Sequence, residues 1–265
     1  MSSPELIAEV AGGVAMLTLN RPDRLNALSQ QMCLLLAERV REAGADEGVR
    51  VIVLGGAGRA FSAGGDVKQM AEDIAAGRPA AFFQEPLAAI HQAASALRSV
   101  QKPVIAALHG AVAGAGLNLA LCCDYRVASD DVVLTQAFTN IGLVPDTGGT
   151  YLLPRLVGLT KATEWLLEGR PVDAREAERW GLVNKVVPKD QLMAEVAWLA
   201  ATLAARPTRA LGLTKHLLDR GAVNTFDEQL ELERRTQAAL GQNSDDYMEG
   251  VRAFIEKRAA TFTGR

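Results

Sequence analysis

The sequence is poor in aromatic residues, in cysteine and in blocks of one charge. Only 5% of its 265 residues are aromatic although 49% are hydrophobic, so the core must consist mainly of Ala, Leu and Val. The net charge is −3 and lysine and arginine form no block, which argues against a dedicated nucleic-acid surface. The length permits one large domain or two small ones with an ample core.

The few cysteines and the N-terminal segment both bear on cellular location. We expect Cys33, Cys122 and Cys123 to be buried free thiols, as in a reducing cytosol. The first ten residues contain neither the basic segment nor the apolar run of a signal peptide. We therefore expect a cytoplasmic protein that has no membrane partner.

The strongest functional signal lies in residues 103–124, PVIAALHGAVAGAGLNLALCCD. A short apolar run predicts a buried strand, three glycines predict a turn, and the leucines that follow predict a buried helix. The N–H groups that begin a helix have no partner inside it and lie at the positive end of its dipole. Residues 109–118 therefore predict a place to hold a negatively charged oxygen.

Two other interpretations of this stretch remain open. It could be a membrane-spanning helix, although Pro103, His109 and Asn118 interrupt the apolar run. It could also be a turn in which glycine serves packing alone.

The first half of the chain alternates strand and helix patterns. Residues 6–10 and 14–20 predict a hairpin, Ser29 predicts a helix cap, and Asp66 predicts a second cap after the glycine-rich residues 55–66. Further strands are expected at 49–54, 125–128 and 132–134, and a helix at 80–101. This alternation predicts a parallel or mixed sheet whose two glycine-rich loops converge at the carboxyl ends of strands.

The last third of the chain is predicted to be helical. Apart from an extended segment at 183–187, helices are expected at 148–156, 158–168, 173–180, 189–205, 207–219, 225–240 and 244–258. Their leucine and alanine stripes should pack on the sheet or on another subunit.

Three ordered motifs resemble the crotonase superfamily, which includes enoyl-CoA hydratases and isomerases. The motifs are AFSAGGDVKQM at 60–70, HGAVAGAGLNLALCCDYRVAS at 109–129 and FTNIGLVPDTGGTYLLPRLVG at 138–158, and the resemblance covers essentially the whole chain. It implies an α/β fold, with a crotonase-like spiral of ββα units over residues 1–200 and a helical trimerisation region over 201–265. It also implies an acyl-CoA thioester substrate, a homotrimer or dimer of trimers, and no metal or further cofactor, because CoA is part of the substrate.

The resemblance implies roles for individual residues. Backbone N–H groups of Gly65 and Ala115 would form an oxyanion hole for the thioester oxygen. Residues matching the positions that hold CoA are Arg24, Leu25, Ala27, Ala63, Asp66, Val67 and Lys68, with Phe254 and Lys257 coming from a neighbouring subunit.

The sequence departs from the hydratase pattern at two positions. Hydratases carry glutamates where this chain has Asn118 and Phe138, and neither residue accepts a proton at neutral pH. Asn118 is expected either to line the substrate pocket or to bond to backbone, and His109 either to line the pocket or to pack with a hydrogen bond.

One carboxylate enters the same region, Asp146. Its motif, GLVPDTGGT, is similar to that of crotonase-family isomerases in aromatic-acid degradation, and a single carboxylate suits a proton shuttle. Burial beside Phe138 and Leu143 should raise its pKa. The alternative for Asp146 is a helix cap.

The sequence therefore predicts an acyl-CoA isomerase, of the enoyl-CoA Δ3,Δ2 type or the ring-epoxide type, acting in fatty-acid or aromatic-acid degradation. The alternatives are an enoyl-CoA hydratase with unusual residues, an aryl-CoA dehalogenase or hydrolase with Asp146 as nucleophile, and a non-catalytic CoA-binding protein.

Overall fold

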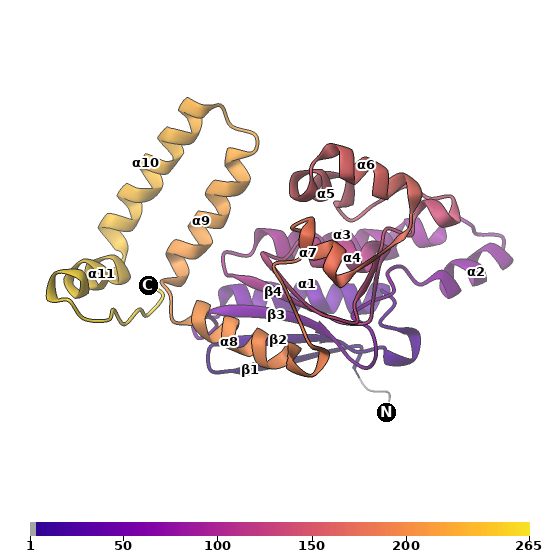
Figure 1. Cartoon of the computed structure of the whole chain (residues 1–265), viewed down its shortest axis with the longest axis horizontal. Coiled ribbons are helices and arrows are strands. Elements are labelled where there is room, and N and C mark those ends of the chain that lie inside the picture. Colours follow the sequence, from indigo (N-terminus) through magenta and orange to yellow (C-terminus); the bar gives the residue numbers. More distant parts are fainter. Residues whose placement is uncertain (1–3) are drawn as a thin grey trace.

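A computed structural model describes residues 4–265 (Figure 1). Its main sheet has six strands in the order β1-β2-β3-β4-β6-β9. The β1–β2 pair is an antiparallel hairpin and the other pairs are parallel, so the predicted mixed sheet is confirmed. The strands are β1 (Leu6–Ala11), β2 (Val14–Leu19), β3 (Val51–Gly56), β4 (Val104–Leu108), β6 (Tyr125–Ser129) and β9 (Lys185–Val187).

Both faces of the main sheet are covered by helices. Alternate residues of β3 and β4 point to opposite sides, so Leu54 and Ala106 belong to one core and Val53 and Ile105 to another. The first core packs against α1 (Gln30–Ala45), α3 (Glu85–Ser99) and α4 (Gly114–Leu121), and the second against α8 (Leu192–Ala204). Burial on both faces explains why these strands are apolar throughout.

A second, three-stranded sheet contains β5 (Ala111–Ala113), β7 (Val133–Thr135) and β8 (Pro171–Asp173). Along the chain β5 follows β4 and precedes α4, so these three elements form one ββα unit. The sequence predicted neither β5 nor β8, because β5 lies between Gly110 and Gly114, which predict a turn, and β8 begins with Pro171 and leads directly into α7 (Ala174–Arg179).

The predicted helix caps are both present. The Ser29 hydroxyl accepts a hydrogen bond from the Met32 N–H at the start of α1. The Asp66 carboxylate accepts one from the Gln69 N–H at the start of α2 (Val67–Ala75). Short 3₁₀ turns occupy η1 (Pro22–Arg24), η2 (Ala81–Phe83), η3 (Thr139–Ile141) and η4 (Lys189–Gln191).

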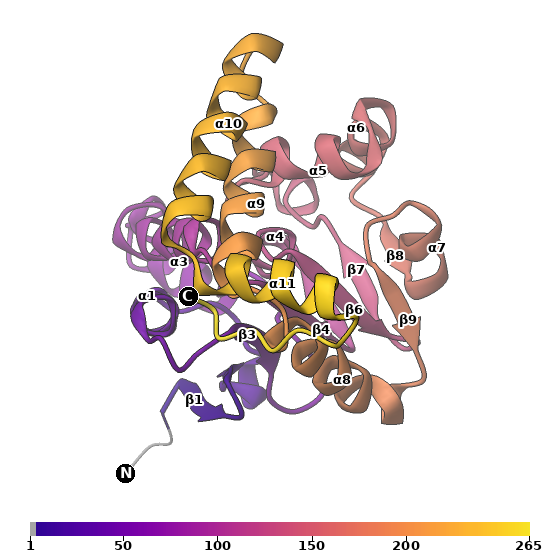
Figure 2. The same ribbon diagram turned by 90° about the vertical axis from the view of Figure 1, so that its left-hand side faces the viewer.

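The helices predicted in the last third are confirmed. They are α5 (Gly149–Val157), α6 (Leu159–Glu168), α7 (Ala174–Arg179), α8, α9 (Thr208–Gly221), α10 (Phe226–Asn243) and α11 (Asp245–Glu256). The α9 and α10 helices run side by side away from the sheet (Figures 1 and 2). The predicted division between residues 200 and 201 lies within α8, and the division into two domains stays a prediction.

The helix predicted within residues 103–124 is α4, which spans only Gly114–Leu121. Between residues 4 and 265 no helix has both the length and the hydropathy of a membrane-spanning segment, so that interpretation of residues 103–124 is wrong. The three cysteines are buried and free, as predicted. Burial raises the pKa of the Cys33 and Cys122 thiols to about 12.

Candidate active site

The glycines of the first glycine-rich segment lie on either side of β5: Gly110 between β4 and β5, and Gly114 at the start of α4. Gly110 and Gly114 have φ angles of 56° and 50°, which glycine adopts without strain, so the turn itself requires glycine. Ala113 precedes α4 and offers no capping side chain. The Ala115 N–H lies in the first helical turn and therefore has no partner within α4. A structural need for glycine and an anion site are thus compatible at this turn.

The second glycine-rich loop lies directly against this helix start. A Cβ atom built on Gly64 would lie 2.6 Å from the carbonyl oxygen of Ala113 and 3.3 Å from the nitrogen of Ala115. The Ala113 N–H donates to the Ser62 carbonyl at 2.9 Å, which ties the two loops together. The loops follow β3 and β4, so the predicted convergence at carboxyl ends of strands is confirmed. The oxyanion roles of Gly65, which is half-buried, and Ala115, which is buried, stay predictions.

The predicted CoA-binding segments lie side by side. The Leu28 N–H donates to the Gly64 carbonyl at 2.7 Å, and the Ala63 N–H donates to the Leu25 carbonyl at 2.9 Å. This pairing brings together the seven residues assigned to CoA in this chain. Of these, Arg24, Val67 and Lys68 are exposed, Leu25 and Ala63 are half-buried, and Ala27 and Asp66 are buried.

Arg21 joins these two segments, and the sequence analysis missed it. Its guanidinium forms an ion pair with Asp66 at 3.0 Å and donates to the Ala27 carbonyl at 2.6 Å. Asp66 thus serves both as the cap of α2 and as the partner of Arg21. No local pattern predicts this pair, because its two members are 45 residues apart.

Phe254 and Lys257 lie away from the other predicted CoA residues. They belong to the end of α11, and Figure 1 shows α11 and α2 at opposite ends of the molecule. Phe254 is 85% exposed. Within one chain the two residues do not join the site, and their contribution from a neighbouring subunit stays a prediction.

Asp146 lies in the loop before α5 and is half-buried. Its carboxylate accepts a hydrogen bond from the Thr147 hydroxyl at 2.7 Å. Burial raises the pKa of the Asp146 carboxyl, and the Thr147 hydroxyl and the neighbouring His91 offset part of this effect. The residue that caps α5 is Gly148, with no side-chain hydrogen bond, so the helix-cap interpretation of Asp146 is wrong.

The Asp146 side chain lines a cavity of about 530 Å³ between α3 and α5. His91 and Ala94 of α3 and Tyr151 of α5 line the same cavity. His91 is exposed, and its Nε2 atom accepts a hydrogen bond from the Thr147 N–H at 3.4 Å. The sequence did not predict this contact, because it spans 56 residues.

Phe138 and Leu143 do not form the expected wall beside the Asp146 side chain. Neither residue lines the Asp146 cavity. The Phe138 ring is buried and lies 3.8 Å from the position that a Cβ atom on Gly114 would occupy. Leu143 packs against the first core. The pKa of Asp146 is raised as predicted, but Ala94 and Leu152, not Phe138 and Leu143, are the apolar residues that line its cavity.

Asn118 and His109, which were each expected either to line the pocket or to form a hydrogen bond, both make hydrogen bonds to backbone. Asn118 is fully buried, and its amide donates to the Asp146 carbonyl at 2.8 Å. A ring nitrogen of the half-buried His109 lies 3.1 Å from the Gly58 carbonyl oxygen. For each residue the structure favours the hydrogen-bonded alternative over a side chain that lines the pocket.

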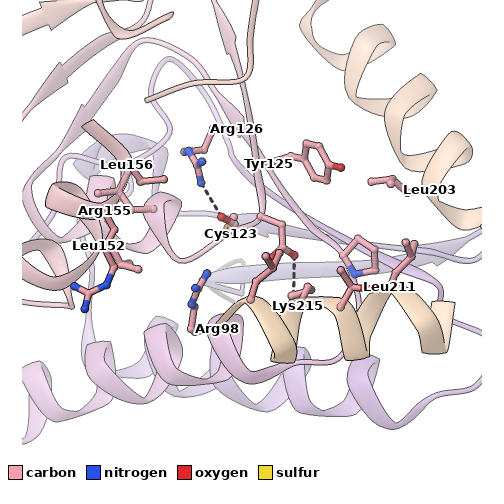
Figure 3. A pocket seen from close by; sticks show the side chains of 15 residues that line it. Arg98, Cys123, Tyr125, Arg126, Leu152, Arg155, Leu156, Leu203, Leu211 and Lys215 are labelled. Atoms are coloured by element: carbon pink, nitrogen blue, oxygen red, sulfur yellow. Dashed lines mark hydrogen bonds and ion pairs between the residues drawn. The ribbon is translucent and has the colours of Figure 1, made fainter. Parts of the chain in front are cut away.

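A second cavity, of about 370 Å³, lies at the amino ends of β4 and β6, the opposite end of these strands from the glycine-rich loops (Figure 3). Figure 3 shows Lys215 of α9 in an ion pair, which it forms with Asp124 at 2.7 Å. Arg126 donates to the carbonyls of Cys123 and Leu182, both at 2.7 Å. The charges of Lys215 and Asp124 are therefore paired with each other, and the Arg126 guanidinium is hydrogen-bonded to backbone carbonyls.

Comparison with known proteins gives a consistent result. Residues 9–265 match the family model described as enoyl-CoA hydratase/isomerase. The chain is 39% identical to the 1,2-epoxyphenylacetyl-CoA isomerase of Escherichia coli K12, covering 98% of each chain. It is 40% identical to a Rhodobacter capsulatus protein named "Probable enoyl-CoA hydratase", covering 100% of each. The crystal structure of an enoyl-CoA hydratase from Polaromonas sp. JS666 superposes with a TM-score of 0.91 at 32% identity, covering 97% of this chain and 99% of that one.

Proposed function

The chain belongs to the enoyl-CoA hydratase/isomerase family, and we propose that it is an acyl-CoA isomerase with Asp146 as its proton shuttle. One observation carries the proposal: Asp146 is the carboxylate among the residues that line the cavity between α3 and α5. The two positions that hold glutamate in hydratases hold Asn118 and Phe138, and both are buried. A single base can move a proton, whereas hydration also requires a positioned water molecule.

The proposed reaction transfers one proton within the acyl group. The ionised Asp146 carboxylate takes a proton from a carbon activated by the thioester, and the C–H electron pair delocalises onto the thioester oxygen. The N–H groups of Gly65 and Ala115 stabilise this oxygen, and one such donor contributes roughly 3–4 kcal/mol. The Asp146 carboxyl then returns its proton two carbons away, so the reaction consumes no co-reactant.

Hydration is the second candidate, favoured by the names of several relatives at similar identity. The R. capsulatus and Polaromonas proteins are both named as hydratases. The absence of a base at residues 118 and 138 argues against efficient hydration. Parallel product analysis of trans-3-hexenoyl-CoA and crotonyl-CoA separates the candidates, because an isomerase converts the first and leaves the second largely unhydrated. A chloroaryl-CoA thioester tests the dehalogenase alternative in the same assay.

The substitution Asp146→Asn tests the base directly. It keeps the shape of the side chain and removes its basicity, so isomerase turnover should fall by roughly 10²–10⁴, the usual contribution of a positioned acid–base group. The matched control is Asp190→Asn, which changes an exposed aspartate elsewhere and should leave turnover unchanged. Near-normal isomerisation by Asp146→Asn would show that the base has been misassigned.

We further propose that the protein binds CoA without a metal ion and assembles as a trimer or a dimer of trimers. The exposed Arg24 and Lys68 beside the glycine-rich loops support CoA binding. Large exposed apolar side chains on α9 to α11, among them Leu218, Phe226 and Phe254, support assembly. Calorimetry with CoA in the presence of a chelator tests the first proposal, and a monomer by light scattering at micromolar concentration would contradict the second.

A further inference from the structure

A directed chain of side-chain amides ends on the backbone of Asp146. Gln136 Nε2 donates to Asn118 Oδ1 at 2.8 Å, and Asn118 Nδ2 donates to the Asp146 carbonyl oxygen at 2.8 Å. Asn118 and Gln136 are 0% and 1% exposed, so water does not compete for these hydrogen bonds. Asn118 lies on α4 three residues after Ala115, which is about one helical turn.

The direction of this chain is fixed by its last acceptor. A carbonyl oxygen can only accept, so Asn118 must turn its NH₂ group towards Asp146 and its oxygen towards Gln136. Gln136 must therefore present its own NH₂ group, which leaves its Oε1 atom buried with no partner among residues 4–265. An unpaired buried acceptor is unfavourable for folding, so stability alone does not explain Gln136.

The loop that carries Asp146 also approaches Asn118 closely. A Cβ atom on Gly149 would lie 2.4 Å from Asn118 Nδ2, so only glycine permits this contact. The Gly149 N–H also donates to the Asp146 carbonyl, at 2.9 Å. Between them, Thr147 has a φ angle of 52°, an unfavourable conformation for a β-branched residue. Such a conformation persists only where the surrounding contacts hold it.

We propose that Asn118, oriented by Gln136, is a positioning residue that holds Asp146 about one helical turn from the oxyanion donor Ala115. The inference rests on the proposed role of Asp146 as the base. Asn118 acts through the Asp146 backbone, and its side chain does not touch the substrate. Hydratases carry a glutamate at the position of Asn118. An ionised glutamate could not donate this hydrogen bond, so it could not hold Asp146 in the same place.

Two substitutions test the inference from opposite directions. Asn118→Ala should lower kcat by roughly 10–100-fold with KM changed less than about threefold, because a base displaced by an ångström loses its alignment with the reacting carbon. Gln136→Met keeps the side-chain length but removes both the donor and the unpaired oxygen. One unpaired buried acceptor, Asn118 Oδ1, then replaces another, Gln136 Oε1, so kcat should fall by roughly 3–10-fold while the melting temperature changes little, a pattern that a purely structural role would not give.

The Asp146→Asn enzyme separates the two proposals. In that background Asn118→Ala should have no further effect on turnover, because both substitutions act on the same base. Asn184→Ala is the matched control: it also removes a hydrogen bond between an asparagine and backbone, at Arg126, and should leave kcat unchanged.

The outcomes are distinguishable. If Asp146→Asn abolishes turnover while Asn118→Ala and Gln136→Met both retain wild-type kcat, the positioning inference alone is overturned. If Asp146→Asn itself retains turnover, the proposed function fails and the inference fails with it. If Asn118→Ala does not fold, Gln136→Met decides the question: a lower kcat at an unchanged melting temperature supports the inference, and an unchanged kcat overturns it.

Discussion

Two aspartates near α4 have a pKa that is raised by burial, but their surroundings differ. Beyond the carboxyl end, Asp124 is paired with Lys215 at 2.7 Å and accepts a hydrogen bond from the Val104 N–H. In the loop before α5, Asp146 has no ion pair among residues 4–265, and its carboxylate accepts a hydrogen bond from the Thr147 hydroxyl. The chain compensates the charge of Asp124 and leaves that of Asp146 available.

The backbone shows the same contrast. At the amino end the glycine-rich turns leave the Ala115 N–H without a partner inside α4. At the carboxyl end, Arg126 satisfies the carbonyl of Cys123, and the Cys122 N–H donates to the carbonyls of Asn118 and Leu119. Unpaired donors and an unpaired base are costly for folding and useful for chemistry, so the Ala115 N–H and the Asp146 carboxylate distinguish the candidate site from the cavity in Figure 3, where the aspartate is paired.

Of the substitutions that test this contrast, the largest effect is expected from Gly64→Ala, because it adds a methyl group where the two glycine-rich loops meet. Gly64→Ala would place a methyl group 2.6 Å from the Ala113 carbonyl, at a φ angle of +89°. The oxyanion donors should lose their alignment, and turnover should fall by roughly 10²–10³. Gly77→Ala is the control, since Gly77 has a φ angle of +72° with nothing within 4 Å of the added atom. Equal losses in the two variants would show that backbone strain, not loop approach, is responsible.

Breaking the ion pair between Lys215 and Asp124, beyond the carboxyl end of α4, should change stability and not turnover. Lys215→Met leaves the carboxylate of Asp124 buried without a counter-ion and should lower the free energy of unfolding by roughly 3 kcal/mol. Turnover per folded enzyme should not change. The control is Lys185→Met, whose partner Glu195 forms a more exposed pair and which should lower stability by less than about 1 kcal/mol. Urea denaturation measures both, and similar losses would contradict the distinction.

The stability deficit of Lys215→Met should depend on pH. Lys215 lowers the pKa of Asp124, so removing it raises that pKa further above the unfolded value. A carboxyl with a raised folded pKa favours the folded state below its unfolded pKa, and this contribution is lost as pH rises through the folded pKa. The difference in urea midpoint from the wild type should therefore be larger at about pH 8 than at about pH 5. A deficit independent of pH would implicate lost packing of the lysine stem.

The smallest effect is expected from removing the Thr147 hydroxyl, which donates a hydrogen bond to the Asp146 carboxylate. Asp146 must be ionised to accept a proton, so turnover should fall on acidification, at a pH above the ordinary aspartate pKa of about 3.9. Thr147→Val removes a hydroxyl that lowers the pKa of Asp146, so the acid limb of kcat/KM should move to higher pH. At neutral pH the rate should change by less than about tenfold, the effect of one hydrogen bond. An unshifted acid limb would contradict Asp146 as the titrating group.

Features that depend on neighbouring residues were predictable from the sequence alone. The caps at Ser29 and Asp66, the glycine-rich turns and the C-terminal helices follow from local chemistry and periodicity. The three-residue strands β5 and β8 escaped prediction because they exist only by pairing with β7. The alternative of a helix cap at Asp146 was wrong because Gly148, two residues later and with a φ angle of 80°, is the residue that caps α5.

The sequence by itself determined the family of the chain and the segment that contains the candidate base, since motif order and glycine spacing are written along one dimension. Only the tertiary structure decided which groups surround that base. Asn118 contacts Asp146 across 28 residues, and His91 contacts Thr147 across 56. Hydrogen bonds of this range leave no periodic pattern in the sequence, because they depend on how α3, α4 and the loop before α5 pack together in space.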